Sequence, residues 1–286
     1  MTRAAGELDP RTVRIGGSEV HYGDSPPANG TVLLLCGIGL TYRAYPKLIS
    51  RLRQAGFRVV SPHIPDLAKV VDRADLGVSL KTIGVITARF AEAVEVEVEE
   101  PLFAIGHSMG GGIASEMIAD CPEGFFGMIL INSIGPSDDR EKTRSTLDWA
   151  LSFPSDLMMT RDILGTVSSV TGDVFRALGS DSQHLMSLAN AAQRADISLA
   201  LKSVREAKIP SYVIHSDNDR VIRFRSYKKT VEILGCDSEV VQGAHGWVLT
   251  DSRTIESAIM PKLIEMREVA YHQHGPFGSL LKEDVV

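Results

Sequence analysis

Apolar residues along the chain fall into short unbroken runs that alternate with stretches of helical periodicity. Residues 30–39 and 57–65 are the first two runs, and each is typical of a strand buried on both faces of a parallel sheet. Between them, residues 42–56 place apolar side chains on one helical face and end in a glycine suited to terminate a helix. The pattern predicts a strand, a helix and a second, parallel strand.

The same alternation continues downstream. Four more strands are expected at residues 101–106, 126–133, 210–216 and 237–244. Strands that alternate with helices indicate an α/β fold with a mostly parallel central sheet and helices on both faces. An early antiparallel hairpin is expected at residues 12–24, with its turn at two glycines. Residues 92–100 alternate like a strand, but we interpret them as the exposed end of the helix that precedes them.

The alternation stops between residue 136 and about residue 194. This stretch lacks a convincing strand and contains several segments with helix start signals. We therefore expect a helical cap at residues 136–194, inserted between two strands of an α/β core that comprises residues 1–135 and 195–286. The last residues, from position 272 on, are expected to form a tail.

The composition adds few constraints. The chain has 286 residues, of which 44% are hydrophobic, enough for a sizeable core. A net charge of −6 gives no electrostatic reason to expect nucleic acid as a partner. The chain lacks an apolar run of ~18 residues and a recognisable signal peptide, which predicts a cytoplasmic protein without a membrane span. Cys36, Cys121 and Cys236 lie far apart in the sequence, in no metal-ligand spacing, so we expect unpaired thiols and no metal.

The candidate chemistry lies in the segment Gly-His-Ser-Met-Gly at residues 106–110. It directly follows a predicted strand and begins a predicted helix, which is the context of a nucleophile elbow. Gly106 and Gly110 would relieve clashes in the tight turn, leaving Ser108 strained, exposed and directed into a cleft. A glycine-rich phosphate-binding or packing turn is the alternative, but no lysine follows and the spacing does not fit Gly-x-Gly-x-x-Gly.

A serine nucleophile needs a base, and the base needs a residue that orients it. His245 lies in a glycine-flanked loop just after the last predicted strand, which is the position that such a base requires. The other histidines after Ser108 lie elsewhere: His184 in the insertion, His215 inside a strand, and His272 and His274 in the tail. The acid is expected after the preceding strand, where Asp217 and Asp219 both stand.

Together these segments resemble the α/β-hydrolase superfamily. Residues 213–219 resemble its Val-Ile-His-Gly-x-x-Asp segment, whose final aspartate is the triad acid, and this favours Asp219 over Asp217. Ser216 stands where the family usually has glycine. The resemblance covers residues 13–136 and 195–264, and it implies a serine hydrolase with a Ser108–His245–Asp219 triad and without a metal or organic cofactor.

The resemblance also implies an oxyanion hole built from backbone N–H groups. The family's early loop usually begins His-Gly, whereas here Cys36 replaces the histidine. Ile38 and Met109 are the expected donors, with Gly39 or Leu40 as alternatives to Ile38. We expect Cys36 to fill space as a small apolar residue rather than to react.

Residues beside the predicted nucleophile, in the early loop and in the insertion are candidate substrate contacts: Gly37, Gly39, His107, Trp149, Met158, Met159 and Trp247. The apolar character of the insertion predicts a small-molecule substrate with an apolar body and a carbonyl near Ser108. His63 occupies the position of a common family aspartate after the second strand, and we interpret it as a packed or solvated loop residue.

Several reactions share this set of residues. Hydrolysis of an ester, a thioester, a lactone or an activated C–C bond would each use it, and the sequence does not separate them. A cofactor-free lyase, cyclase or oxygenase on the same fold is one alternative. A non-catalytic ligand-binding protein is another, although it would not need an aligned base. The oligomeric state is left open.

Overall fold

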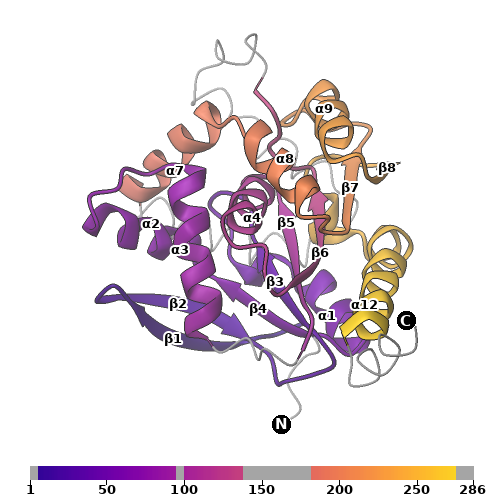
Figure 1. The fold of residues 1–286 in the computed structure, drawn as a ribbon, viewed down its shortest axis with the longest axis horizontal. Coiled ribbons are helices and arrows are strands. Elements are labelled where there is room, and N and C mark those ends of the chain that lie inside the picture. Colours follow the sequence, from indigo (N-terminus) through magenta and orange to yellow (C-terminus); the bar gives the residue numbers. More distant parts are fainter. Residues whose placement is uncertain (1–5, 95–99, 138–181, 275–286) are drawn as a thin grey trace, which may run out of the picture.

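The computed structural model of the protein describes residues 6–94, 100–137 and 182–274, and it contains one eight-stranded sheet with helices on both faces (Figure 1). The strands are β1 (Asp9–Ile15), β2 (Ser18–Asp24), β3 (Thr31–Leu35), β4 (Arg58–Pro62), β5 (Leu102–His107), β6 (Phe125–Ile131), β7 (Ser211–Ser216) and β8 (Asp237–Val241). The longer helices are α1 (Pro46–Gln54), α2 (Ile64–Arg73), α3 (Leu80–Ala93), α4 (Met109–Asp120), α7 (Ser182–Arg194), α8 (Ser198–Glu206), α9 (Phe224–Leu234) and α12 (Met260–His274). The short ones are the 3₁₀ turn η1 (Tyr42–Ala44), α10 (Trp247–Thr250), α11 (Ser252–Thr254) and the π-helix η2 (Ile255–Ile259).

The strand order across the sheet is β1-β2-β4-β3-β5-β6-β7-β8. β1 and β2 form the expected hairpin, in which Gly16 and Gly17 turn the chain with φ of 56° and 79°. β2 also pairs antiparallel with β4, and every further pairing is parallel. The prediction of a mostly parallel α/β fold is therefore confirmed, and the carboxyl ends of β5, β6, β7 and β8 meet at one edge.

The unbroken apolar runs follow from burial of the sheet on both faces. In β3, Leu33 and Leu35 pack into the cluster formed with α2, α3, α4 and α8. Val32 and Leu34 pack into the opposite cluster, with α1, α10 and α12. All four side chains are fully buried, and each burial contributes about 1.5–3 kcal/mol. Helices cover both faces of the sheet and exclude water from its centre, so no residue of a central strand needs to be polar.

The segment after β4 differs from the sequence-based expectation. The strand ends at Pro62 rather than continuing to residue 65, and the supposed loop is helix α2. His63 lies at the helix N-cap position, where its Nδ1 is 3.1 Å from Oδ2 of the buried Asp66. The helix forms because apolar residues recur at three- and four-residue intervals and face the core.

The ends of the other predicted elements also need correction or lie outside the described residues. α12 continues to His274, so His272 and His274 belong to a helix and not to a tail. α3 ends at Ala93, and residues 95–99 lie outside the described ranges. So do Trp149, Met158, Met159 and most of the predicted cap, from which only residues 136–137 and 182–194 are described, the latter as α7. Within the described ranges, no helix is both long and apolar enough to cross a bilayer.

Candidate active site

The turn from β5 into α4 holds Ser108 in a strained conformation. Its φ is 56° and its ψ is −121°, a region that a side-chain-bearing residue rarely occupies. A Cβ added to Gly106 would overlap the Cα of Gly111, and one added to Gly110 would overlap the carbonyl oxygen of Leu35. Both glycines are required by this geometry, because backbone atoms on either side leave no room for a methyl group.

The Ser108 side chain is buried, which corrects the expectation that it is exposed. Its side chain is 0% exposed, and its Oγ makes no hydrogen bond with the described residues. The backbone of Gly37 lies beside it, since a Cβ added there would be 3.5 Å from the Cβ of Ser108. An unpaired buried hydroxyl costs about 1–3 kcal/mol. Unpaired buried groups of this kind are commonly found at functional sites.

His245 and Asp219 form a buried pair. His245 Nδ1 lies 2.8 Å from Asp219 Oδ2, and the two side chains are 1% and 0% exposed. Burial raises the pKa of Asp219, but the His245 ring and the backbone N–H groups of Val221 and Ile222 lower it further than burial raises it. The net result is a pKa below the ordinary value. An ionised carboxylate only accepts hydrogen bonds, so Nδ1 of His245 carries a proton and Nε2 is the basic nitrogen.

Asp217 lies outside this pair. It is exposed, and its Oδ1 accepts a hydrogen bond from the backbone N–H of Gly243 at 3.0 Å. The structure thus brings Asp219, rather than Asp217, to His245. The other histidines after Ser108 have different surroundings: His184 pairs with Asp72, His215 stacks on Tyr227, and His272 is exposed on α12.

Asn132 bridges the strand ends between Ser108 and His245, and sequence reasoning missed it. It follows β6 with a φ of 43° and is fully buried. Its Nδ2 donates to the Oγ of Ser216 and to the carbonyl oxygen of His245, both at 2.9 Å, and its Oδ1 accepts from the N–H of Ser216. The hydroxyl of Ser216 also donates to the Ala244 carbonyl, at 3.2 Å. The only available signal was an asparagine after a buried strand, a residue type that tolerates positive φ.

The expected oxyanion donors lie on the two segments that flank Ser108. Met109 is the first residue of α4, and the first four N–H groups of a helix have no partner within it. Ile38 follows Gly37, where an added Cβ would be 3.5 Å from the Cβ of Ser108. The alternative donor Leu40 is already engaged, because its N–H donates to the carbonyl of Gly37 at 3.1 Å.

Two of the candidate substrate contacts are core residues. His107 is fully buried, and Trp247 is 2% exposed within the apolar cluster on the α1 and α12 side of the sheet. Gly37 and Gly39 do lie in the loop after β3. A Cβ added to Gly39 would be 3.7 Å from the Leu185 side chain of α7, so an apolar group approaches this loop from the described end of the insertion.

Cys36 is a packed residue in this structure. It is fully buried, and its Sγ lies 3.5 Å from the Oγ of Ser61. That hydroxyl donates to the carbonyl of Leu34 at 2.8 Å, so the thiol is the donor of the pair.

We therefore expect Cys36→Ala to keep the kcat of ester hydrolysis within about tenfold of wild type, a change of about 1.4 kcal/mol in the barrier. In a thiol-alkylation time course on the folded protein, the half-buried Cys121 should react before Cys36. A loss of turnover as deep as that of Ser108→Ala, with Cys36 the first thiol alkylated, would show that Cys36 takes part in the chemistry.

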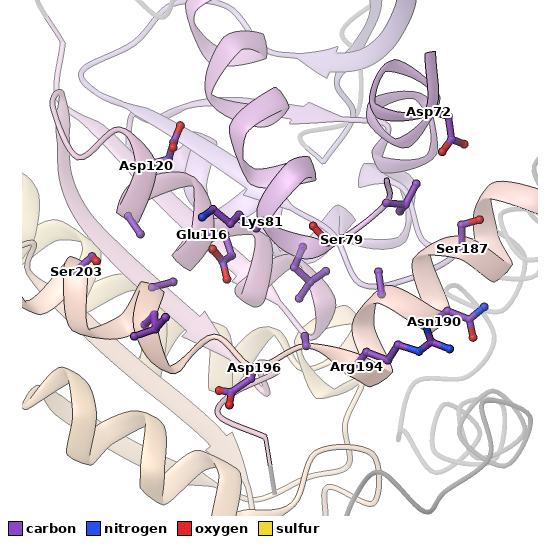
Figure 2. Close-up of a pocket in the computed structure, with 17 residues that line it drawn as sticks. Asp72, Ser79, Lys81, Glu116, Asp120, Ser187, Asn190, Arg194, Asp196 and Ser203 are labelled. Carbon is purple, nitrogen blue, oxygen red and sulfur yellow. The ribbon is translucent and has the colours of Figure 1, made fainter. Parts of the chain in front are cut away.

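A pocket of about 720 Å³ lies apart from this site, between α3, α4, α7 and α8 (Figure 2). Its ionisable lining residues carry both signs of charge: Asp72, Lys81, Glu116, Asp120, Arg194 and Asp196. Glu116 lies eight residues after Ser108 on the same helix, which is about 12 Å along its axis. The charges do not suit an apolar substrate, and none of the predicted site residues lines the pocket. Among the described residues, no cluster of three or more His, Cys, Asp or Glu could hold a metal ion.

The match to a known family covers the elements that carry this geometry. The family model described as serine aminopeptidase, S33, matches residues 85–247, more than half of the chain. The matched segment includes Ser108, Asp219 and His245. The chain belongs to the serine aminopeptidase S33 family of α/β hydrolases. As in the prediction, the sheet, the elbow and the loops at its carboxyl edge are those of an α/β hydrolase.

Individual relatives of this α/β hydrolase have diverse activities. A protein of Mycobacterium phage D29 described as a non-heme haloperoxidase is 24% identical over 275 residues, which cover 88% of this chain and 92% of the phage protein. A solved membrane phospholipase A superposes with a TM-score of 0.73 at 19% identity, over 93% of this chain and 88% of its own. A bromoperoxidase from Bacillus anthracis superposes with a TM-score of 0.71 at 18% identity, over 90% and 100%. These structural similarities establish the fold. The reaction has to be inferred from the residues of the site.

Proposed function

We propose that this α/β hydrolase is a serine hydrolase that cleaves an ester, thioester or lactone of a largely apolar small molecule through an acyl-enzyme on Ser108. The observation that carries the proposal is the buried His245–Asp219 pair at 2.8 Å, assembled at the same sheet edge as a strained serine. A packing turn would need neither the strain nor the pair. A phosphate-binding turn would not need a histidine oriented by a buried carboxylate.

In the first half of the reaction, Nε2 of His245 accepts the proton of Ser108 while Oγ attacks the carbonyl carbon. The carbonyl oxygen becomes an oxyanion, which the N–H groups of Ile38 and Met109 stabilise by about 3 kcal/mol each. Asp219 stabilises the imidazolium that has formed. The tetrahedral intermediate collapses, the leaving group takes the proton from Nε2, and the acyl group stays on Ser108.

In the second half, His245 accepts a proton from water, and the resulting hydroxide attacks the acyl carbon. The new oxyanion uses the same two N–H groups, and Ser108 leaves with the proton from Nε2, which releases the acid. The Ser108–His245 hydrogen bond is not formed in the present conformation. Such bonds often tighten only in the complex with substrate, so the mechanism requires the two side chains to come within hydrogen-bonding distance.

The substrate class is tested with p-nitrophenyl esters of increasing acyl length, an acyl thioester and an aminoacyl p-nitroanilide. The apolar approach of Leu185 to the Gly37–Gly39 loop supports esters of apolar acids as the preferred substrates. We expect kcat/KM for the best ester to exceed that for the anilide by about 100-fold or more. A preference for the anilide would make the protein a peptidase and contradict the proposal.

A haloperoxidase-type activity is the second candidate, because the relative from phage D29 that aligns over 88% of the chain is described as a non-heme haloperoxidase. Bromination of monochlorodimedone by hydrogen peroxide and bromide measures it in the same preparation. Bromination that exceeds ester hydrolysis and persists in Ser108→Ala would favour this candidate over the serine hydrolase. Bromination that is lost with Ser108 would mean that both activities depend on the same nucleophile.

A further inference from the structure

His107 directly precedes Ser108 and has both ring nitrogens engaged. Its Nδ1 lies 2.8 Å from Oη of Tyr45, and its Nε2 lies 3.1 Å from the backbone carbonyl oxygen of His245. The side chain is fully buried, and its ring centroid is 4.9 Å from that of His245. The residue therefore lies between the loop that carries the proposed base and the helix that carries Tyr45 at its N-terminus.

The hydrogen atoms in these contacts can be assigned from the chemistry of the partners. A carbonyl oxygen only accepts, so Nε2 of His107 must carry the hydrogen that it shares with His245. Burial and the nearby His245 ring lower the pKa of His107 to about 3, so the ring is neutral at ordinary pH. A neutral imidazole with its hydrogen on Nε2 has a bare Nδ1, which accepts the hydroxyl hydrogen of Tyr45.

Tyr45 continues the chain of hydrogen bonds to the oxyanion loop. Its Oη accepts the backbone N–H of Gly37 at 2.9 Å. A Cβ added to Gly37 would be 3.2 Å from Nδ1 of His107 and 3.5 Å from Oη of Tyr45, so the three groups meet closely. One directed chain thus runs from Gly37 N–H to Tyr45, from the Tyr45 hydroxyl to His107, and from His107 Nε2–H to the carbonyl of His245.

We propose that His107 is a positioning residue. It fixes the positions of the oxyanion loop at Gly37 and the base loop at His245 relative to each other and to Ser108. The inference rests on the proposed serine hydrolase function. Ile38 adjoins one end of the chain and the His245 ring the other, so one proposed oxyanion donor and the proposed base both depend on it. A misplacement of about 1 Å at such a site can cost about 10²-fold in rate. Asn132 donates to the same His245 carbonyl at 2.9 Å and supports the base loop from the β6 side.

Two substitutions at position 107 separate positioning from substrate binding. The amide nitrogen of His107→Gln lies near the place of Nε2 and can still donate to the His245 carbonyl. The shorter amide of His107→Asn lies near the place of Nδ1 and cannot reach that carbonyl. With p-nitrophenyl butyrate, we expect His107→Asn to lower kcat about tenfold with KM within about twofold of wild type. His107→Gln should keep kcat within about threefold.

Tyr45→Phe tests the other end of the chain and decides the question if His107→Asn does not fold. It removes only the hydroxyl, and kcat should fall about tenfold with KM unchanged. In the double variant with His107→Asn, the loss should be smaller than the product of the two single losses, because one chain is cut twice. Tyr227→Phe is the matched control, since it also removes only a tyrosine hydroxyl, a partly buried one that donates to the Oγ of Ser238 at 3.0 Å. The kcat of this variant should equal that of wild type.

The positioning role is overturned if folded His107→Asn and Tyr45→Phe keep wild-type kcat, or if KM rises while kcat stays constant. The second result would make His107 a substrate contact, as the sequence alone suggested. Equal losses in His107→Asn and His107→Gln would also overturn it, because the bond to His245 would then not matter. Ser108→Ala is measured alongside. If it keeps turnover, the proposed function fails and the positioning role with it, whereas an inactive Ser108→Ala with active variants at 107 and 45 overturns the positioning role alone.

Discussion

Replacing Ser108 with alanine should lower the kcat of ester hydrolysis by about 10⁴-fold or more, and His245→Ala should cost about as much. The two residues act as a unit, because an unaided serine hydroxyl is a weak nucleophile and an imidazole without the serine has nothing to activate. Asp219→Asn should cost about 10⁴-fold, because an amide next to Nδ1 favours the wrong tautomer of His245. Turnover is measured with p-nitrophenyl butyrate after circular dichroism has confirmed that each variant is folded.

Asp217→Asn is the matched control for Asp219→Asn. Both changes replace a carboxylate by an amide in the same loop, but Asp217 is exposed and accepts its hydrogen bond from the N–H of Gly243 rather than from His245. An asparagine Oδ1 can accept the same bond, so kcat should stay within about twofold of wild type. A deep loss in Asp217→Asn with an active Asp219→Asn would reverse the assignment of the acid.

Gly110→Ala should lower the free energy of unfolding by about 3 kcal/mol and remove activity. A Cβ at this position would overlap the carbonyl oxygen of Leu35, which belongs to a central strand and cannot move aside without disturbing the sheet. The helix α4 must then shift away from β3, and Ser108 shifts with it. Urea unfolding followed by circular dichroism measures the stability.

Gly112→Ala in the same helix is the control. Its Cβ would be in ordinary contact with Ile134 at 3.6 Å and would come too close only to the end of the Leu80 side chain, at 2.7 Å, which can rotate away. Alanine also gains up to about 1 kcal/mol over glycine in helix propensity. The free energy of unfolding should therefore stay within about 1 kcal/mol of wild type. Equal destabilisation by the two changes would show that the elbow is not as tight as the contact with Leu35 implies.

The sequence predicted those features that local pattern determines. Unbroken apolar runs identified the buried strands because each residue of a strand such as β3 packs against a helical layer on one face or the other. The elbow could be recognised because nearby backbone atoms leave no room for a side chain at Gly106 or Gly110, and this requirement appears in the sequence as glycines at fixed positions around the serine. The choice of Asp219 over Asp217 came from the family resemblance, and the loop geometry brings the same residue to His245.

The features that sequence reasoning missed depend on contacts between distant parts of the chain. Tyr45 meets His107 across 62 positions, and Asn132 meets His245 across 113. No local pattern distinguishes these residues from an ordinary helix tyrosine or a loop asparagine. His107 was expected to contact substrate because it neighbours Ser108. Its full burial, on which the proposed positioning role rests, becomes visible only in the packed sheet.

Labelling with a fluorophosphonate tests the central claim most directly, because this reagent forms a covalent bond with an activated serine. The intact mass of the protein is measured over time, and the modified residue is located by peptide mapping. The account predicts one adduct, on Ser108, which is absent in Ser108→Ala. In His245→Ala the rate of adduct formation should be about 100-fold lower than in wild type, or lower still. Folded wild-type protein that hydrolyses esters without acquiring an adduct, or with its adduct on another serine, would contradict the account.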